Sequence, residues 1–299
     1  MDVGVRLIET FAKGEDAVVA LGRGSAAGSE AFRETLRSTT FVIIPMENEN
    51  GRDLVEKGDL CERKNGHGVD PNRNWALDWG VKAPDYDPKE EYPGKAPFSE
   101  PESRILRDLV ADFKPHAVVN WHSGMSAVFT PYDHVAREPT GPGAEAMLQF
   151  ARVIDAEHCD KKCVLGSGGK GVGYLAHGTA ADYIYDTMHV PVVYTWEIYG
   201  DLKAKYEDCY RMFNPVTRES YEAVVQAWIG APITLVSMLD KHPDINVQRG
   251  GRQGMRPRSV TTVEETTSVP FFGALAFALF VFACLFGLRR RRSRLIGRK

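Results

Sequence analysis

The chain has 299 residues, of which 43% are hydrophobic and 26% charged, and this composition excludes a disordered or fibrous protein. The formal net charge is −3, although the last eleven residues alone carry seven positive charges, so the rest of the chain is acidic. An acidic domain argues against nucleic acid as a partner, because phosphate binding requires a basic face.

Apolar runs and amphipathic segments alternate through the first 242 residues. The pattern predicts helices over residues 1–12, 100–113, 143–157 and 214–239. Short, continuous apolar runs predict strands over residues 41–45, 117–121 and 190–195. Strands separated by helices indicate an α/β domain with a largely parallel sheet and helices on both of its faces.

The C-terminal region divides into three parts of different composition. Residues 243–268 are rich in glycine, arginine and threonine and predict an exposed stalk. Residues 269–288 contain an uncharged apolar run of membrane-spanning length, which predicts a single transmembrane helix. The basic residues 289–299 predict a cytoplasmic tail, so the domain of residues 1–242 is expected on the lumenal or extracellular side of the membrane.

Four of the five cysteines lie in the predicted domain, at positions 61, 159, 163 and 209, and four cysteines can pair in three ways. The close spacing of Cys159 and Cys163 predicts a local disulfide in an oxidising compartment. A zinc site made from these four cysteines is not expected, because they form no Cys-x-x-Cys pair.

Polar residues follow two of the predicted strands. His122 and Ser123 end one strand, and Glu197 ends another. Active sites of open α/β sheets gather at the carboxyl ends of strands, so these residues are candidates for a shared site.

Five separated motifs resemble, in order and spacing, those of the zinc carboxypeptidase family, the M14 metallopeptidases. The motifs are Glu62-Arg63-Lys64 with GVDPNRNW (68–75), YPGKAPFSEPE (92–102), His122-Ser123 with Pro131-Tyr132, YLAHGTAADY (174–183) and Thr195-Trp196-Glu197. The resemblance implies a three-layer α/β/α domain around a mixed, largely parallel sheet. It also implies a zinc-dependent metallocarboxypeptidase that removes C-terminal residues from peptides or proteins.

The same resemblance implies a role for individual residues. Arg73 would bind the terminal carboxylate of a peptide, because a planar guanidinium can donate two parallel hydrogen bonds to it. Asn72, the Tyr174 phenol and Ser123 would complete the substrate-binding group.

Glu197 would act as the base that handles the proton of the attacking water, and Arg63 would stabilise the oxyanion. Ala181 falls at the base of the pocket for the C-terminal side chain. A small apolar residue offers no countercharge to Lys or Arg there, so peptides with neutral C-terminal residues are the expected substrates.

His122 matches one zinc ligand of the family, but catalytic zinc takes three protein ligands. The other two come from a His-x-x-Glu motif, and none of the eight histidines in the chain has Glu three residues later. No signal sequence is visible either, although the predicted topology requires one. We therefore expect the domain to be truncated at its N-terminus, with both features encoded upstream of Met1, and the chain as written to be close to inactive.

The alternative is a noncatalytic relative that binds peptide C-termini through Arg73. Translation of the genomic DNA upstream of Met1 distinguishes the two hypotheses. An in-frame His-x-x-Glu behind a signal sequence is expected for the enzyme, and a stop codon for the noncatalytic protein.

Overall fold

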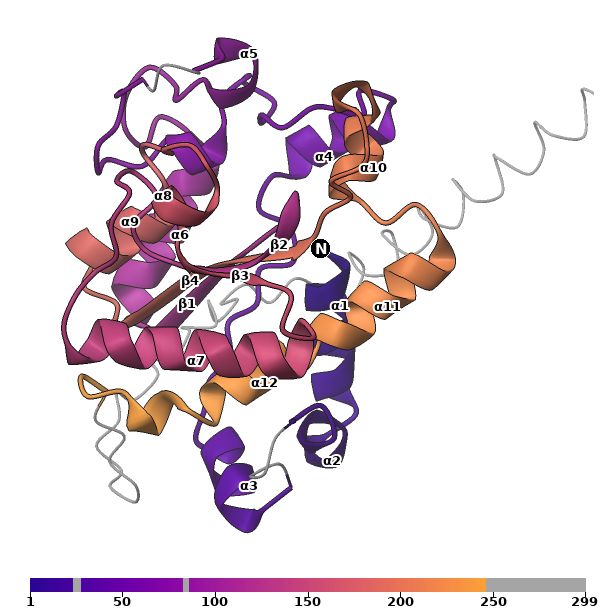
Figure 1. Ribbon diagram of the computed structural model, residues 1–299, viewed down its shortest axis with the longest axis vertical. Helices are drawn as coiled ribbons and strands as arrows, with labels where there is room; N and C mark the ends of the chain where they lie inside the picture. Colours follow the sequence, from indigo (N-terminus) through magenta and orange to yellow (C-terminus); the bar gives the residue numbers. More distant parts are fainter. Residues whose placement is uncertain (24–27, 83–85, 246–299) are drawn as a thin grey trace, which may run out of the picture. The chain divides into compact units, whose positions relative to one another are not determined.

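A four-stranded mixed sheet forms the centre of the computed structural model, which describes residues 1–23, 28–82 and 86–245 (Figure 1). The strand order is β1 (Ala117–His122), β4 (Val192–Tyr199), β2 (Met125–Thr130) and β3 (Val164–Ser167). β1 pairs with β4 in parallel and β2 with β3 in parallel, whereas β2 and β4 are antiparallel. The prediction of a mixed sheet is confirmed.

Helices surround this sheet. The longer ones are α1 (Asp2–Ala12), α2 (Glu15–Val19), α3 (Glu30–Arg37), α4 (Glu49–Glu56), α6 (Pro101–Phe113), α7 (Pro142–His158), α10 (Cys209–Phe213), α11 (Arg218–Trp228) and α12 (Ala231–Val236). The other helical segments are η1 (Pro71–Arg73), α5 (Pro88–Glu91), α8 (Gly168–Gly171), α9 (Ala180–Asp182), η2 (Tyr183–Thr187), η3 (Tyr206–Asp208) and η4 (Leu239–Lys241).

The alternating side chains of β4 contact helices on opposite faces of the sheet. Tyr194 and Trp196 are fully buried and belong to a core that includes residues of α7 and α12. Val193 points the other way, into a core with residues of α6 and α9. Figure 1 shows α7 and α12 running together along one side of the sheet. The structure therefore has the predicted layers, with helices on both faces.

A further apolar core lies beside this sheet and joins the two ends of the described chain. It contains residues of α1, α2 and α3 together with residues of α11 and α12. The prediction of one helix over residues 214–239 is wrong at this point, because α11 ends at Trp228 and α12 begins at Ala231. Pro232 lies in the first turn of α12, where its missing N–H group is tolerated.

The predicted strand over residues 41–45 is also wrong, since this segment has no regular secondary structure. Phe41 and Ile43 pack against the core next to α1, whereas Val42 and Ile44 remain 48% and 43% exposed. A strand requires a neighbouring strand with which to exchange hydrogen bonds, and no described strand pairs with this segment.

The four cysteines of the domain form two disulfides, Cys61–Cys209 and Cys159–Cys163. The second is the local bridge predicted from spacing. The first connects residues 148 positions apart in the sequence.

Contacts within the chain define one compact unit from Met1 to Val247. The predicted stalk, transmembrane helix and basic tail lie almost entirely or entirely outside the described residues and stay predictions. Within the part of the chain that the structure describes, no helix is long and apolar enough to cross a membrane.

Candidate active site

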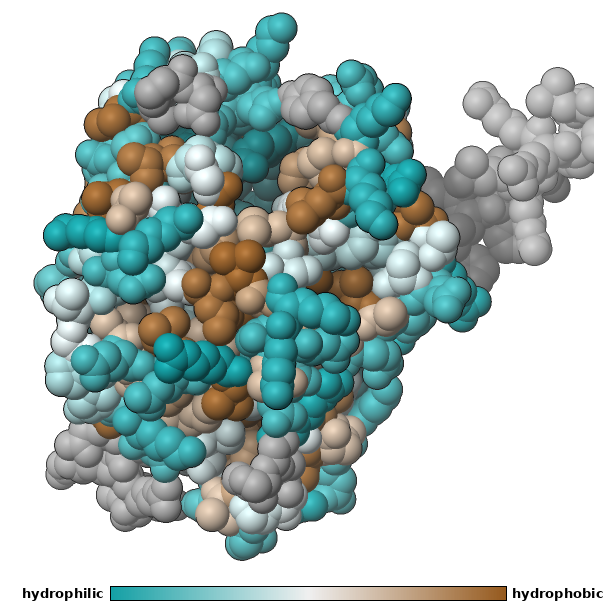
Figure 2. All heavy atoms as spheres, viewed as in Figure 1, coloured by the Kyte–Doolittle hydropathy of each residue, from teal (hydrophilic) through white to brown (hydrophobic). Residues whose placement is uncertain are grey.

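A cavity of about 270 Å³ lies at the carboxyl end of β1. It is lined by Glu47, Asn48, Arg63, Asp70, Pro71, Asn72, Asn120, Trp121, His122 and Ala180. In Figure 2, the surface is hollowed between the region of α5 and that of α4 and α10. The lining residues come from five separate stretches of sequence, so the fold brings predicted site residues from different motifs together.

His122 and Glu197 lie directly opposite each other, because β1 and β4 pair in parallel with these two residues in register. The His122 Nδ1 atom is 3.8 Å from Glu197 Oε1. The sequence prediction that both side chains share one edge of the sheet is therefore met by the geometry.

The protonation of this pair is set mainly by burial. Loss of hydration, together with the positive charge of Arg63, lowers the pKa of His122 to about 4, so the imidazole is neutral near pH 7. Burial raises the pKa of Glu197 to about 7, against the opposing effect of Arg63. A carboxyl group with such a pKa can both accept and release a proton near neutral pH.

Glu197 also has spare hydrogen-bonding capacity. Its Oε2 atom is buried and has no hydrogen-bond partner among the described residues. A buried acceptor without a partner is energetically unfavourable and is often found where a ligand or water binds.

Arg63 supplies a fixed positive charge to the cavity. Its Nε donates to Asp70 Oδ2 at 2.7 Å, and Asp70 is almost fully buried. Asp70 is the main cause of a raised pKa for Arg63. Burial raises the pKa of Asp70, but the charges of Arg63 and Arg73 and hydrogen bonds from Arg63 and the Asn72 backbone bring it below its usual value. Both partners are therefore ionised, and the Arg63 side chain still keeps 38% of its surface exposed.

Asn72 is held between two loops. It lies in η1, whose N-cap Asp70 accepts a hydrogen bond from the Asn72 backbone N–H. Its own side-chain oxygen accepts a hydrogen bond from the backbone N–H of Ala180 at 2.9 Å. The amide group thus ties the Asn-Arg motif to the loop that carries Tyr174.

Gly178 allows these two loops to approach closely. Its φ angle is +71°, and a Cβ atom at this position would lie 2.5 Å from the Arg73 carbonyl oxygen. Its carbonyl accepts a hydrogen bond from the Trp75 backbone N–H. Only glycine fits both the backbone conformation and the available space.

Arg73 differs from the sequence expectation in its surroundings. It does not line the cavity of His122 but a smaller hollow next to it, together with Tyr86, Glu91 and His177. Its guanidinium donates to Glu91 Oε1 at 2.6 Å, and its side chain is only 7% exposed. The predicted carboxylate-binding group is therefore already paired with a carboxylate of the same chain.

The remaining predicted residues occupy three different environments. Tyr174 lies in a loop, 40% exposed, where it contributes to the electrostatic environment of Arg63. Ser123 is half-buried in the link between β1 and β2. Ala181 is 2% exposed and packs in the apolar core with Trp75, whereas its neighbour Ala180 lines the cavity.

Comparison with known proteins gives a consistent family assignment. The family model of the zinc carboxypeptidases matches residues 25–226. A zinc carboxypeptidase of Simulium vittatum is 28% identical over 57% of this chain and 60% of its own length. Carboxypeptidase B2 of Rattus norvegicus is 29% identical over 66% of this chain and 50% of its own length.

The chain belongs to the zinc carboxypeptidase family.

Solved structures show the same fold. The crystal structure of thrombin-activatable fibrinolysis inhibitor superimposes with a TM-score of 0.60 at 24% identity, over 80% of this chain and 58% of that protein. The bovine inhibitor, solved in complex with a tick carboxypeptidase inhibitor, gives a TM-score of 0.55 at 28% identity, over 67% of this chain and 69% of the other. This member of the zinc carboxypeptidase family spans only half to three-fifths of the length of the two curated relatives above.

Several residues of this carboxypeptidase-family cavity were missed by the sequence interpretation. Asp70 lies inside the Asn-Arg motif, and Asn120 precedes His122 by two positions, which places both side chains on one face of β1. The buried Asn120 Nδ2 donor has no partner among the described residues. Alternation along the strand could have identified Asn120. Glu47 could not have been found this way, because its segment has no regular structure.

Two buried carboxylates, Asp182 and Asp133, lie near Ala181. Asp182 accepts hydrogen bonds from the backbone N–H groups of Asp133 and His134 and pairs with the His134 ring at 2.6 Å. Burial and the nearby charge of Asp182 raise the pKa of Asp133. Acidic groups therefore lie close in the fold to the residue from which neutral specificity was predicted, and the role of Ala181 stays a prediction.

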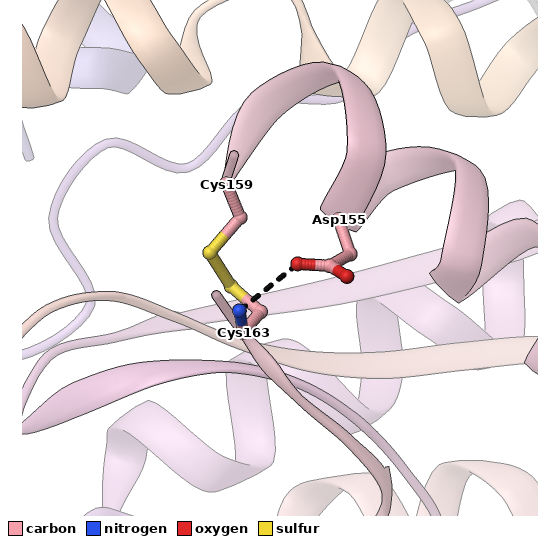
Figure 3. A group of neighbouring side chains, drawn as sticks. All are labelled: Asp155, Cys159 and Cys163. Carbon is pink, nitrogen blue, oxygen red and sulfur yellow. Dashed lines mark hydrogen bonds between the residues drawn. A yellow bond between two sulfur atoms is a disulfide. The ribbon is translucent and has the colours of Figure 1, made fainter. Parts of the chain in front are cut away.

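The residues described do not make a zinc site of the family's kind. The one group of close metal-ligand atoms in the described part of the chain is Asp155, Cys159 and Cys163 (Figure 3). Its two sulfurs form a disulfide and its carboxylate accepts the Cys163 backbone N–H at 2.9 Å, so no thiolate is left to bind a metal. Among the described residues, His122 is therefore the one that matches a zinc ligand of the family.

Proposed function

We propose that this chain belongs to a zinc-dependent metallocarboxypeptidase that removes C-terminal residues from peptides or proteins. The observation that carries the proposal is the shared cavity, which places Arg63 and Asn72 of one motif together with His122 of another. Glu197 lies directly across from His122. Family membership supports the same reaction class.

The chain's own groups fit the steps of binding and proton transfer. Asn72, Tyr174 and Arg73 hold the terminal carboxylate of the peptide, and the Arg63 guanidinium stabilises the negative charge that develops on the carbonyl oxygen of the scissile bond. Glu197, with its pKa near 7, accepts a proton from the attacking water and donates it to the leaving amine.

Zinc binding by this chain is expected to be weak, because His122 is the one residue of the described cavity that matches a zinc ligand of the family, and catalytic zinc takes three. Metal analysis of the purified full chain after dialysis against a weak chelator should find well below one equivalent of zinc. A His122→Ala variant should look the same as the original chain. Stoichiometric zinc that survives dialysis, and is lost in the variant, would show that the site is complete without a His-x-x-Glu motif.

Recognition of a terminal carboxylate can be tested without metal. Fluorescence anisotropy of a labelled pentapeptide ending in Leu is expected to show binding to the full chain, and the C-terminal amide of the same peptide should bind about tenfold more weakly, since charge-assisted hydrogen bonds contribute about 1.5–3 kcal/mol.

Arg73→Lys keeps the charge but loses the planar fork, so it should reduce this difference between acid and amide. A peptide ending in Arg tests the predicted preference for neutral residues. Equal binding of acid and amide by the original chain would refute carboxylate recognition.

A further inference from the structure

Arg73 is the most heavily engaged of the predicted substrate-binding residues. Its Nη2 atom donates to Glu91 Oε1 at 2.6 Å, and its Nη1 atom donates to the carbonyl oxygen of Asn72 at 3.1 Å. The second carboxylate nearby, Asp70, lies 3.9 Å from Nη1. Because Asp70 is bound closely to Arg63, Glu91 is the direct counterion of Arg73.

A carboxylate on a guanidinium is the same contact that the terminal carboxylate of a peptide would make. Arg73 has 7% of its side chain exposed and Glu91 has 22%, so little of the guanidinium is free for a second carboxylate. The two ligands would compete for the same donors.

We infer that Glu91 is an internal competitor for the peptide carboxylate, and that a substrate must displace it from Arg73. This inference rests on the proposed role of Arg73 in binding peptide C-termini. It makes Glu91 a residue that sets substrate affinity, although no motif marks it.

The position of Glu91 in the fold suits such an exchange. Glu91 is the last residue of α5, a four-residue helix with no buried side chain. The chain directly after it is fixed, because the Tyr92 carbonyl accepts a hydrogen bond from the Asp70 backbone N–H and the Pro93 carbonyl accepts one from the Asn74 side chain. Segments with few buried contacts open at low free energy, so the Glu91 side chain can leave while its anchor holds.

The positive charge of Arg73 would remain balanced after Glu91 is released. The incoming peptide carboxylate replaces one negative charge with another, and Asp70 remains within 3.9 Å of the guanidinium. Displacement of this kind avoids the large penalty of a buried charge without a partner. Glu91 moves towards solvent, where a carboxylate is well hydrated.

The test compares Glu91→Gln with Glu90→Gln in the full chain, using the labelled pentapeptide acid and its amide. The two glutamates are neighbours in α5, and no ion pair involves Glu90 among the described residues. Both variants remove one negative charge, so general electrostatic attraction of the peptide changes equally. Loss of a competing ion pair is expected to raise the affinity of Glu91→Gln for the acid about tenfold, whereas Glu90→Gln should show only the small general electrostatic change.

A second variant keeps the experiment informative if Glu91→Gln is poorly folded. Glu91→Asp keeps the charge but shortens the side chain, and it should give an affinity between the original chain and Glu91→Gln. The amide should bind all variants alike, because it offers Arg73 no carboxylate.

Two results would overturn the inference, and they are distinguishable. If acid is still preferred over amide but Glu91→Gln and the original chain bind the acid equally, Glu91 is no competitor and the proposed role of Arg73 stands. If acid and amide bind alike in every variant, including Arg73→Lys, the peptide carboxylate does not bind at Arg73 and the proposed function fails as well.

Discussion

Replacing both Cys61 and Cys209 with serine is expected to lower the free energy of unfolding by about 4–5 kcal/mol, because the bridge closes a very long loop in the unfolded chain. The two cysteines are 148 positions apart in the sequence, and the entropy that a crosslink removes from the unfolded state grows with loop length. Denaturant unfolding of the full chain, followed by tryptophan fluorescence, measures the change.

The chain contains its own control for this prediction. Cys159 and Cys163 are only 4 positions apart, so the loop-entropy relation gives about 2 kcal/mol for their double serine variant. Both double variants replace the same number of sulfur atoms. Equal losses of stability in the two variants would contradict an explanation based on loop length.

The Cys61–Cys209 bridge also connects the segment before Arg63 to α10. Cys61 lies two residues before Arg63, and Cys209 begins α10. At the other end of α10, the Phe213 ring packs against Gly124. A Cβ atom on Gly124 would lie 2.8 Å from this ring and 3.8 Å from Glu197 Oε2. The bridge therefore links the segment of Arg63, the proposed oxyanion residue, to the segment that packs beside Glu197, the proposed base.

The sequence was most informative where the position of a residue follows from the local pattern around it. His122 and Glu197 each end an apolar run, and parallel pairing of two such strands necessarily places their ends at one edge. The Cys159–Cys163 bridge is similar, since five residues of chain fix its geometry. These predictions required only local pattern and one general rule about sheets.

Sequence patterns were less informative where structure depends on a distant partner. Residues 41–45 have the composition of a buried strand, but strand formation depends on a neighbour that no described strand provides. Conversely, β2 and β3 were not predicted, although both are in the sheet. β3 has only four residues, two of them Gly166 and Ser167, so its apolar signal is weak and its pairing with β2 determines its conformation.

The pairing of Arg73 with Glu91 was equally hidden from sequence interpretation. The motif around Arg73 identifies the arginine, but no spacing rule connects it to a glutamate 18 positions further on, at the end of α5. Their contact depends on how the loop of residues 86–93 folds back on η1. Tertiary structure thus determines whether a predicted binding residue is free or already occupied.

Asn74→Ala is expected to lower the free energy of unfolding by about 3–4 kcal/mol, because it leaves several buried polar groups without partners. The Asn74 side chain is fully buried. Its amide nitrogen donates to the Pro93 and Ala96 carbonyl oxygens and to Ser99 Oγ, and its oxygen accepts from the Glu100 backbone N–H and from Ser103 Oγ. One side chain therefore holds the whole segment from Pro93 to Ser103 against the Asn-Arg motif.

This contact gives a physical reason for two motifs to occur together, since Asn74 recognises the backbone of the Pro-Gly segment that follows Glu91. Denaturant unfolding of Asn74→Ala can be compared with Asn50→Ala, at an exposed position in α4 where the change should stay within about 0.5 kcal/mol. Peptide affinity should fall in Asn74→Ala and not in Asn50→Ala, because Arg73 and Glu91 are both adjacent to the disrupted contact. If Asn74→Ala unfolds at the same denaturant concentration as Asn50→Ala, these five hydrogen bonds contribute little, and something else must hold the two motifs together.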